Sequence, residues 1–177
     1  MNRQFCFLSL LIIFSILFVG SSSRAEEKDP IEKATAFINY YNKKDFLGAT
    51  KIFHYPPNYT AAELNEDKAA ISKTLKMYYE EFGKIEHFEK SDMPPLYYFH
   101  MIGGGNLPYW QKYSDVYNVN LKVKFSREGE GYVTIVFCNI LNKWEIRQVN
   151  YGLSADRIDA QTRLNSIKEK WQKMMGL

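Results

Sequence analysis

Apolar residues recur every three or four positions through the first half of the chain, a spacing that predicts helices. A first helix is expected to begin at Asp29-Pro30, with Asp29 as its cap and Pro30 at the first helical position. A short second helix should follow the capping residue Asp45 and bury Leu47 with its other apolar residues.

A third and longer helix is predicted over about residues 65–82. Thr60 and Glu63, just before it, have the spacing of a capping box, and Gly83 is a natural stop. The two consecutive prolines within residues 54–58 disfavour helix, so that segment should be a loop. The first half of the chain is therefore expected to be helical.

The second half changes to the alternating period of β-strands. The clearest alternation predicts a long strand with one buried and one solvated face, and the next strand is apolar on both faces and should be central. Alternation slips after Ile146, as a β-bulge would cause. The expected strands cover residues 83–89, 96–102, 113–126, 132–141 and 144–151.

A closing helix is predicted over residues 154–177, with Ile158 among its inward-facing residues. Helices followed by an antiparallel meander form the α+β class. The apolar face of the bent sheet needs cover, and the long third helix is available to supply it. We therefore expect N-terminal helices packed on a bent sheet around a cone-like cavity, with an extra C-terminal helix.

The N-terminal residues have the layout of a secretory signal peptide. A basic start precedes an apolar run that ends at Gly20, and small residues precede a cleavage point after Ala25. The run is shorter than the roughly 20 residues that span a bilayer, so membrane attachment is expected only if the leader stays uncleaved. Residues 1–25 are predicted to be a leader and residues 26–177 a single exported domain, periplasmic or secreted.

Charge, cysteine content and histidine spacing exclude several classes of partner, cross-link and metal site. The chain carries 23 basic and 20 acidic residues, two of the basic ones in the leader, and it shows no basic stripe, which argues against nucleic acid. Cys138 is the one cysteine after the leader, so no intrachain disulfide is available, and its apolar surroundings predict a small buried side chain. No histidine spacing typical of a metal site occurs, and we expect no metal and no cofactor.

The order of the expected elements resembles the nuclear-transport-factor-two-like superfamily, which has a cystatin-like α+β fold. The resemblance rests on "MYYEEFGKIEHFE", the long alternating strand and "GYVTIVFCNILNKWEIRQVNYGL", above all its "NKWEIRQVNY". It implies a cone-shaped cavity, and the helix after Gly152 is an addition to the usual core. The superfamily includes cofactor-free isomerases and dehydratases as well as exported domains without known activity.

The enzymes of this superfamily use carboxylates, tyrosines or histidines that point into the cone. The resemblance therefore makes Asp115, Tyr117 and His100 candidate catalytic residues, with His54 as a further candidate. Asp115 lies on an otherwise apolar strand face, where burial would raise the pKa of a general base, or at a frayed strand start, where it is solvated. The tyrosines are expected to bury their rings and keep their hydroxyls at the rim.

Aromatic residues supply the candidates for ligand binding, because binding pockets are lined mainly by apolar and aromatic side chains. The candidates are Tyr79, Tyr98, Tyr109 and Trp110. The run Gly103–Gly105 lacks the lysine and hydroxyl residue of a phosphate-binding loop and opens no helix, so it is predicted to be a turn between strands.

Two functions stay open at this point. The first is a non-catalytic exported domain that binds a small apolar ligand or a protein partner, a homodimer included, in or around the cavity. The second is a cofactor-free isomerase or dehydratase that uses a carboxylate with a tyrosine or histidine. The fold by itself does not decide between them.

Overall fold

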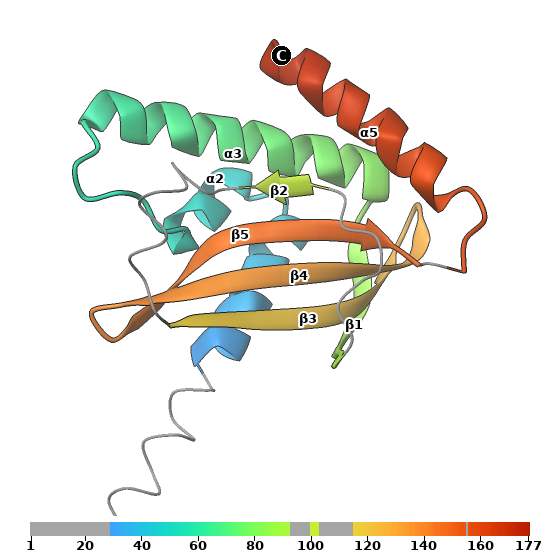
Figure 1. Ribbon diagram of the computed structural model, residues 1–177, viewed down its shortest axis with the longest axis horizontal. Coiled ribbons are helices and arrows are strands. Elements are labelled where there is room, and N and C mark those ends of the chain that lie inside the picture. The colour runs from blue at the N-terminus through green and yellow to red at the C-terminus, as the bar shows by residue number, and fades with distance from the viewer. Residues whose placement is uncertain (1–28, 93–99, 103–114, 155) are drawn as a thin grey trace, which may run out of the picture.

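The computed structural model describes residues 29–92, 100–102, 115–154 and 156–177, and it is an α+β structure, as expected (Figure 1). The helices cover residues 29–42, α2 (Phe46–Ala49), the 3-10 turn η1 (Thr50–Ile52), α3 (Ala61–Phe82) and α5 (Ala160–Met175). The strands are β1 (Ile85–Lys90), β2 (His100–Ile102), β3 (Val116–Phe125), β4 (Gly129–Ile140) and β5 (Lys143–Leu153). Within these ranges, no helix combines the length and apolar character needed to cross a membrane.

The predicted capping residues set the ends of the short and the long helix. The Asp45 carboxylate accepts a hydrogen bond from the Gly48 amide at 2.8 Å at the start of α2. Thr60 and Glu63 form the expected capping box, which begins α3 four residues earlier than the apolar periodicity indicates. Gly83 ends α3 with a φ of 82°, a backbone conformation that residues with a Cβ atom rarely adopt.

Three expectations about helix residues are wrong. Leu47 is 61% exposed, because a helix of a single turn can turn only part of its apolar residues inward. Ile158 is fully exposed, because α5 begins only at Ala160. Asp29 is itself helical and pairs with Lys33 one turn on, at 3.5 Å, so it does not act as the expected cap.

The strands form one antiparallel sheet in the order β1-β3-β4-β5-β2, and the sheet is not closed into a barrel. β4 is central, as its two apolar faces predicted. The predicted bulge in β5 is confirmed: Phe137 pairs with Ile146 and Val136 with Gln148, so Arg147 is the extra residue. The strand segments expected at residues 96–99 and 113–114 lie outside the described residues.

One face of the sheet forms the core with the first helix and α3. Val119, Leu121, Val123 and Phe125 alternate into this core along β3, as predicted. The other face is exposed or half-buried along β3, as predicted, and is buried at the centre of the sheet. Its centre holds the buried side chains of Thr134 and Asn150, where the Thr134 hydroxyl donates to Asn120 Oδ1 at 2.9 Å. A buried polar side chain needs such a partner.

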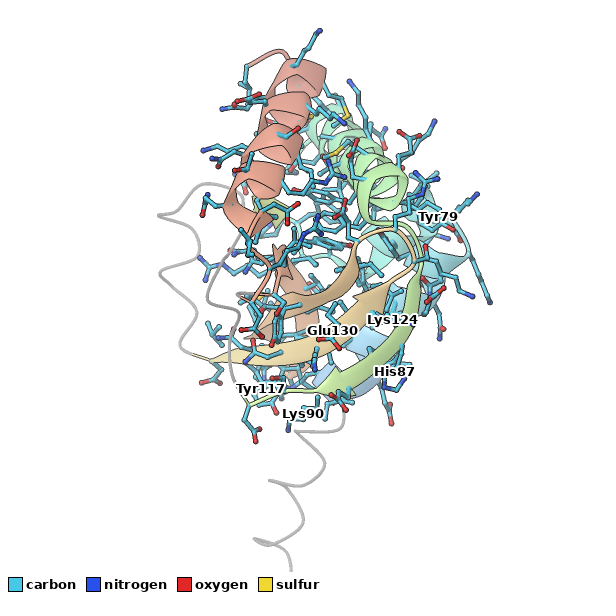
Figure 2. All side chains as sticks on the ribbon, turned by 90° about the vertical axis from the view of Figure 1, so that its right-hand side faces the viewer. Tyr79, His87, Lys90, Tyr117, Lys124 and Glu130 are labelled. Carbon is cyan, nitrogen blue, oxygen red and sulfur yellow. The ribbon has the colours of Figure 1, made fainter. Side chains whose placement is uncertain are left out.

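The helix α5 packs against α3 (Figures 1 and 2), and charged side chains connect the two helices. Arg163 donates to Glu81 on α3 at 2.9 Å and to Glu128 in the β3–β4 turn at 2.6 Å. Lys170 donates to Glu81 at 2.8 Å, and Arg157 donates to Glu128. Glu81 therefore receives two cationic donors from α5.

We predict that Glu81→Gln weakens the docking of α5 in a pH-dependent way. Burial alone would raise the pKa of the Glu81 carboxyl, but the hydrogen bonds and charges of Lys170 and Arg163 outweigh it and lower the pKa. The stabilisation is therefore present above the unfolded-state pKa and is lost as the pH falls through the folded-state pKa. Urea unfolding at about pH 7 should show a loss of about 1 kcal/mol that disappears toward about pH 2.

Glu80→Gln is the matched control, because Glu80 is exposed on the same turn of α3 and no ion pair of its carboxylate is seen among the described residues. It should leave the unfolding free energy within about 0.5 kcal/mol of the wild type. Equal losses in the two variants would contradict a special role for Glu81.

Candidate functional site

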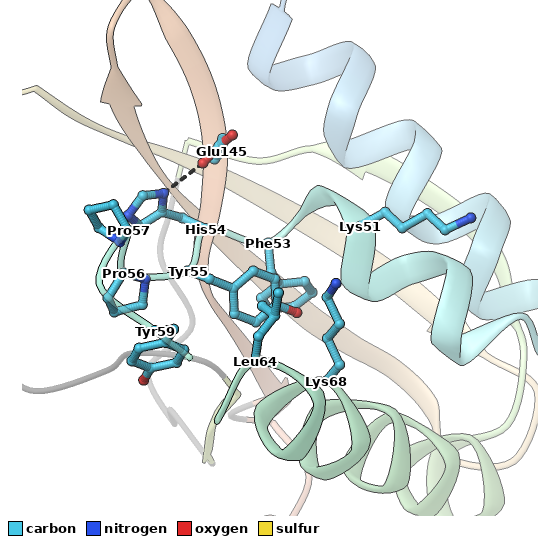
Figure 3. A pocket seen from close by; sticks show the side chains of 10 residues that line it. All are labelled: Lys51, Phe53, His54, Tyr55, Pro56, Pro57, Tyr59, Leu64, Lys68 and Glu145. Carbon is cyan, nitrogen blue, oxygen red and sulfur yellow. Dashed lines mark hydrogen bonds and ion pairs between the residues drawn. The ribbon is translucent and has the colours of Figure 1, made fainter. Parts of the chain in front are cut away.

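A pocket of about 540 Å³ lies beside the segment that links η1 to α3 (Figure 3). This segment, the first turns of α3 and the start of β5 supply its walls. Its volume is typical of small-molecule sites. The lining residues are Lys51, Phe53, His54, Tyr55, Pro56, Pro57, Tyr59, Leu64, Lys68 and Glu145.

Backbone contacts with β5 fix the floor of the pocket. Phe53 forms a parallel bridge with Ile146, and the His54 amide donates to the Ile146 carbonyl at 2.8 Å. Pro56 and Pro57 then carry the chain away, since neither has an amide to extend the pairing. The segment thus leaves the sheet edge immediately after His54 and turns toward α3.

The first turns of α3 form the facing wall. The capping box at Thr60 starts this helix beside the pocket, and Leu64 and Lys68 then lie one turn apart on the same helix face. The Lys68 ammonium lies 5.6 Å from the centre of the Tyr55 ring, a cation–π contact. A lysine is thereby held at the edge of an aromatic surface.

The two tyrosines of the pocket are neutral phenols at physiological pH. Burial, with a contribution from Asp67, raises the pKa of Tyr55 to about 12 despite the hydrogen bond that its hydroxyl donates to the Thr50 carbonyl at 2.9 Å. Burial and Asp67 also raise the pKa of Tyr59. Neither ring therefore supplies a negative charge to the pocket.

A histidine and a carboxylate meet on the side of the pocket opposite the lysines (Figure 3). His54 Nδ1 lies 2.6 Å from Glu145 Oε2, and the ring nitrogen donates because a carboxylate only accepts. The His54 side chain is 7% exposed and that of Glu145 36%.

The pocket therefore combines three kinds of surface. Phe53, Tyr55 and the two prolines offer apolar and aromatic contact, Lys51 and Lys68 offer positive charge, and His54 with Glu145 offers acid–base and hydrogen-bonding groups. Such a site can hold a small molecule with an apolar body and a few polar groups.

The structure does not bring the sequence-predicted catalytic residues together. Asp115 is exposed just before β3, and its backbone carbonyl accepts from the Asn139 amide at 3.1 Å, so it is solvated at the strand start. Tyr117 is half-buried and packs edge-on against Trp144. His100 lies in β2 at the far side of the sheet from β3, where it pairs with Tyr151.

Of the predicted ligand-binding residues, Tyr79 is the one that the structure describes, and it does not line the pocket. Tyr79 is half-buried against Tyr41 and Phe46, and Figure 2 shows it well apart from Tyr117. Tyr98, Tyr109 and Trp110 lie outside the described residues, as does the run Gly103–Gly105.

Glu145 was missed by sequence reasoning, although His54 was recognised as a candidate by its residue type. The two residues are far apart in sequence and meet because residues 53–54 pair with the edge of β5. The proline pair after His54 signals a loop, but no local pattern identifies the strand that this loop joins.

Large aromatic side chains fill the centre of the core between the helices and the sheet. The largest fully buried ones are Tyr41, Tyr78, Tyr151, Phe37, Phe82, Phe125 and Phe137. The expectation that the tyrosines keep their hydroxyls at the rim is wrong for Tyr41 and Tyr151. The Tyr41 hydroxyl donates to the Gly83 carbonyl at 3.1 Å inside the core. Among the described residues, no group is within hydrogen-bonding distance of the buried Tyr151 hydroxyl.

The described residues support neither a reactive cysteine nor a metal site. Cys138 is buried, as predicted, and burial together with the Glu145 carboxylate raises the pKa of its thiol to about 11. No group of three or more His, Cys, Asp or Glu side chains among the described residues is close enough to hold a metal ion.

Comparisons with models of known protein families, with curated proteins and with solved structures give no match to this chain.

Removing the hydroxyl of Tyr41 and removing that of Tyr151 should change the free energy of unfolding in opposite directions. Tyr41→Phe should lower the free energy of unfolding by about 1 kcal/mol, because it deprives the Gly83 carbonyl of its donor. Tyr151→Phe should be neutral or stabilising by up to about 1 kcal/mol, because it removes a buried hydroxyl without a partner. Urea unfolding of both variants measures the difference, and equal destabilisation would show that the Tyr151 hydroxyl is hydrogen-bonded.

Proposed function

We propose that the protein is an exported binding domain that holds a small ligand with an apolar or aromatic body in the pocket beside His54. The observation that carries the proposal is a pocket of about 540 Å³ lined by three aromatic rings, two prolines and a leucine. Ligand sites are typically concave and mostly apolar, with a few polar groups that orient the ligand. The leader-like residues 1–25 support export.

The packed core favours this pocket over the centre of the cone. Fully buried aromatic rings occupy the space between α3 and the sheet, and a ligand there would have to displace them. The pocket beside His54 needs no such rearrangement. The resemblance to the nuclear-transport-factor-two-like superfamily is consistent with a binding role, and we propose that the chain shares its architecture.

The neutral fluorophore N-phenyl-1-naphthylamine tests the proposal, because its emission rises when it enters an apolar site. The full chain should bind it saturably. Leu64→Trp should weaken binding about tenfold or more, since the larger side chain takes up pocket volume on the α3 wall. Direct excitation of the fluorophore avoids the protein's own tryptophans.

Leu47→Trp is the matched control, because Leu47 is exposed on α2 and does not line the pocket. It should leave the affinity unchanged. Absence of saturable binding to the wild type, or equal affinities in the two tryptophan variants, would contradict binding in this pocket. Circular dichroism melting of each variant verifies that it is folded.

A second candidate function is proton transfer without a cofactor, and the short hydrogen bond between His54 and Glu145 favours it. A carboxylate hydrogen-bonded to a histidine ring orients the imidazole, an arrangement common where histidine acts as a general base. Such a base removes a proton next to a carbonyl group, the double bond shifts, and the proton returns at the γ-carbon. This reaction is an isomerisation and consumes no further reactant.

Isomerisation of cyclohex-3-enone to its conjugated isomer, followed by ultraviolet absorbance, tests this candidate. His54→Gln should lower the enzymatic rate by a factor on the order of 100 or more. His87→Gln, on the exposed edge strand β1, should leave the rate unchanged. A wild-type rate equal to that of buffer, or full activity in His54→Gln, would exclude proton transfer of this kind and leave the binding proposal intact.

A further inference from the structure

We infer that the ligand of this pocket carries one anionic group, a carboxylate or sulfonate, which binds beside the Lys68 ammonium while the apolar body contacts Phe53 and Tyr55. This inference rests on the proposed binding function and adds the chemical class of the ligand. It follows from how the charges of the pocket are arranged and from which of them are already paired.

The negative charges at the pocket already have partners. Glu145 pairs with His54 at 2.6 Å, on the side away from the lysines. Glu63, five residues before Lys68, accepts from the Thr60 amide and hydroxyl at 2.7 and 2.8 Å as part of the capping box. Asp67 does not line the pocket and lies near the Tyr59 and Tyr55 hydroxyls.

The positive charge of Lys68, by contrast, faces an aromatic ring. Its ammonium lies 5.6 Å from the centre of the Tyr55 ring, and no carboxylate within the described residues forms an ion pair with it. A cation–π contact orients the lysine but leaves N–H donors for a further acceptor. Lys68 is half-buried and lines the pocket one helical turn after Leu64.

Lys51 adds a second positive charge on the same side. It lines the pocket from η1 and is exposed, and Figure 3 shows Lys51 and Lys68 on the side opposite His54 and Glu145. Tyr55 and Tyr59 stay neutral, so they do not cancel this charge. The lysine side of the pocket therefore attracts an anion, and the aromatic floor next to it contacts an apolar body.

This charge pattern disfavours a cationic ligand. An ammonium group on the lysine side would face the like charge of Lys68, and on the other side it would compete with His54 for Glu145. A neutral ligand would fill the pocket but leave the Lys68 ammonium with its ring contact alone. An anionic group gives the ammonium a charge-assisted hydrogen bond.

Two fluorophores that differ by one anionic group test the inference. They are N-phenyl-1-naphthylamine and its 8-sulfonate, 8-anilinonaphthalene-1-sulfonate. The full chain should bind the sulfonate about tenfold more tightly than the neutral compound. The advantage should shrink as salt is raised from about 0.05 to 0.5 M, because exposed charges are screened.

Lys68→Met removes the charge and keeps most of the stem. It should abolish the roughly tenfold preference for the sulfonate and leave the affinity for the neutral compound within about twofold. Lys51→Met should reduce the preference by a smaller factor. Lys76→Met is the control, because Lys76 is exposed two turns further along α3 and does not line the pocket.

The outcomes separate this inference from the proposed function. Binding of both compounds with equal affinity, or an unchanged sulfonate preference in Lys68→Met, overturns the anionic class and leaves the binding function standing. Failure of both compounds to bind overturns the inference and the proposed binding function together. A preference for the sulfonate that is lost in Lys68→Met and kept in Lys76→Met supports the inference.

Discussion

The Tyr151 ring lies where the first helix, α3 and the sheet meet. Its centre is 5.9 Å from that of Tyr41, 4.7 Å from that of Tyr78, 5.6 Å from that of Phe82 and 6.3 Å from that of Phe125. Aromatic pairs at such distances contribute about 0.5–1.5 kcal/mol each beyond their buried area. One residue of β5 thus contacts the first helix, α3 and strand β3 within a single core.

This junction also explains why the pocket lies at the edge of the core. Because large rings fill the centre, space for a ligand is left where the chain leaves the sheet after Phe53 and His54 and returns as α3. The prolines at residues 56 and 57 prevent further pairing with β5 and keep this segment apart from the sheet. The pocket is a consequence of how the first helices connect to α3.

The C-terminal helix α5 is attached to the rest of the fold by charged side chains as well as by apolar contacts. The core depends on aromatic packing, whereas Arg163 and Lys170 of α5, together with Arg157 just before it, bind Glu81 and Glu128. Leu164 and Ile167 bury its apolar face. Charged contacts of this kind depend on pH and salt, so the docking of α5 should respond to both.

The local chemistry of the sequence determined the α+β class, the ends of α3, the bulge in β5 and the central place of β4, because caps and apolar periodicity act between near neighbours. Tertiary structure determined which side chains lie together in the candidate site. His54 meets Glu145, and Lys68 meets Tyr55, through contacts between separate segments. Residue types alone pointed instead to Asp115, which is solvated because β3 begins only at Val116. Periodicity specifies which face of an element is buried, whereas the pairing of distant segments specifies which side chains share a pocket.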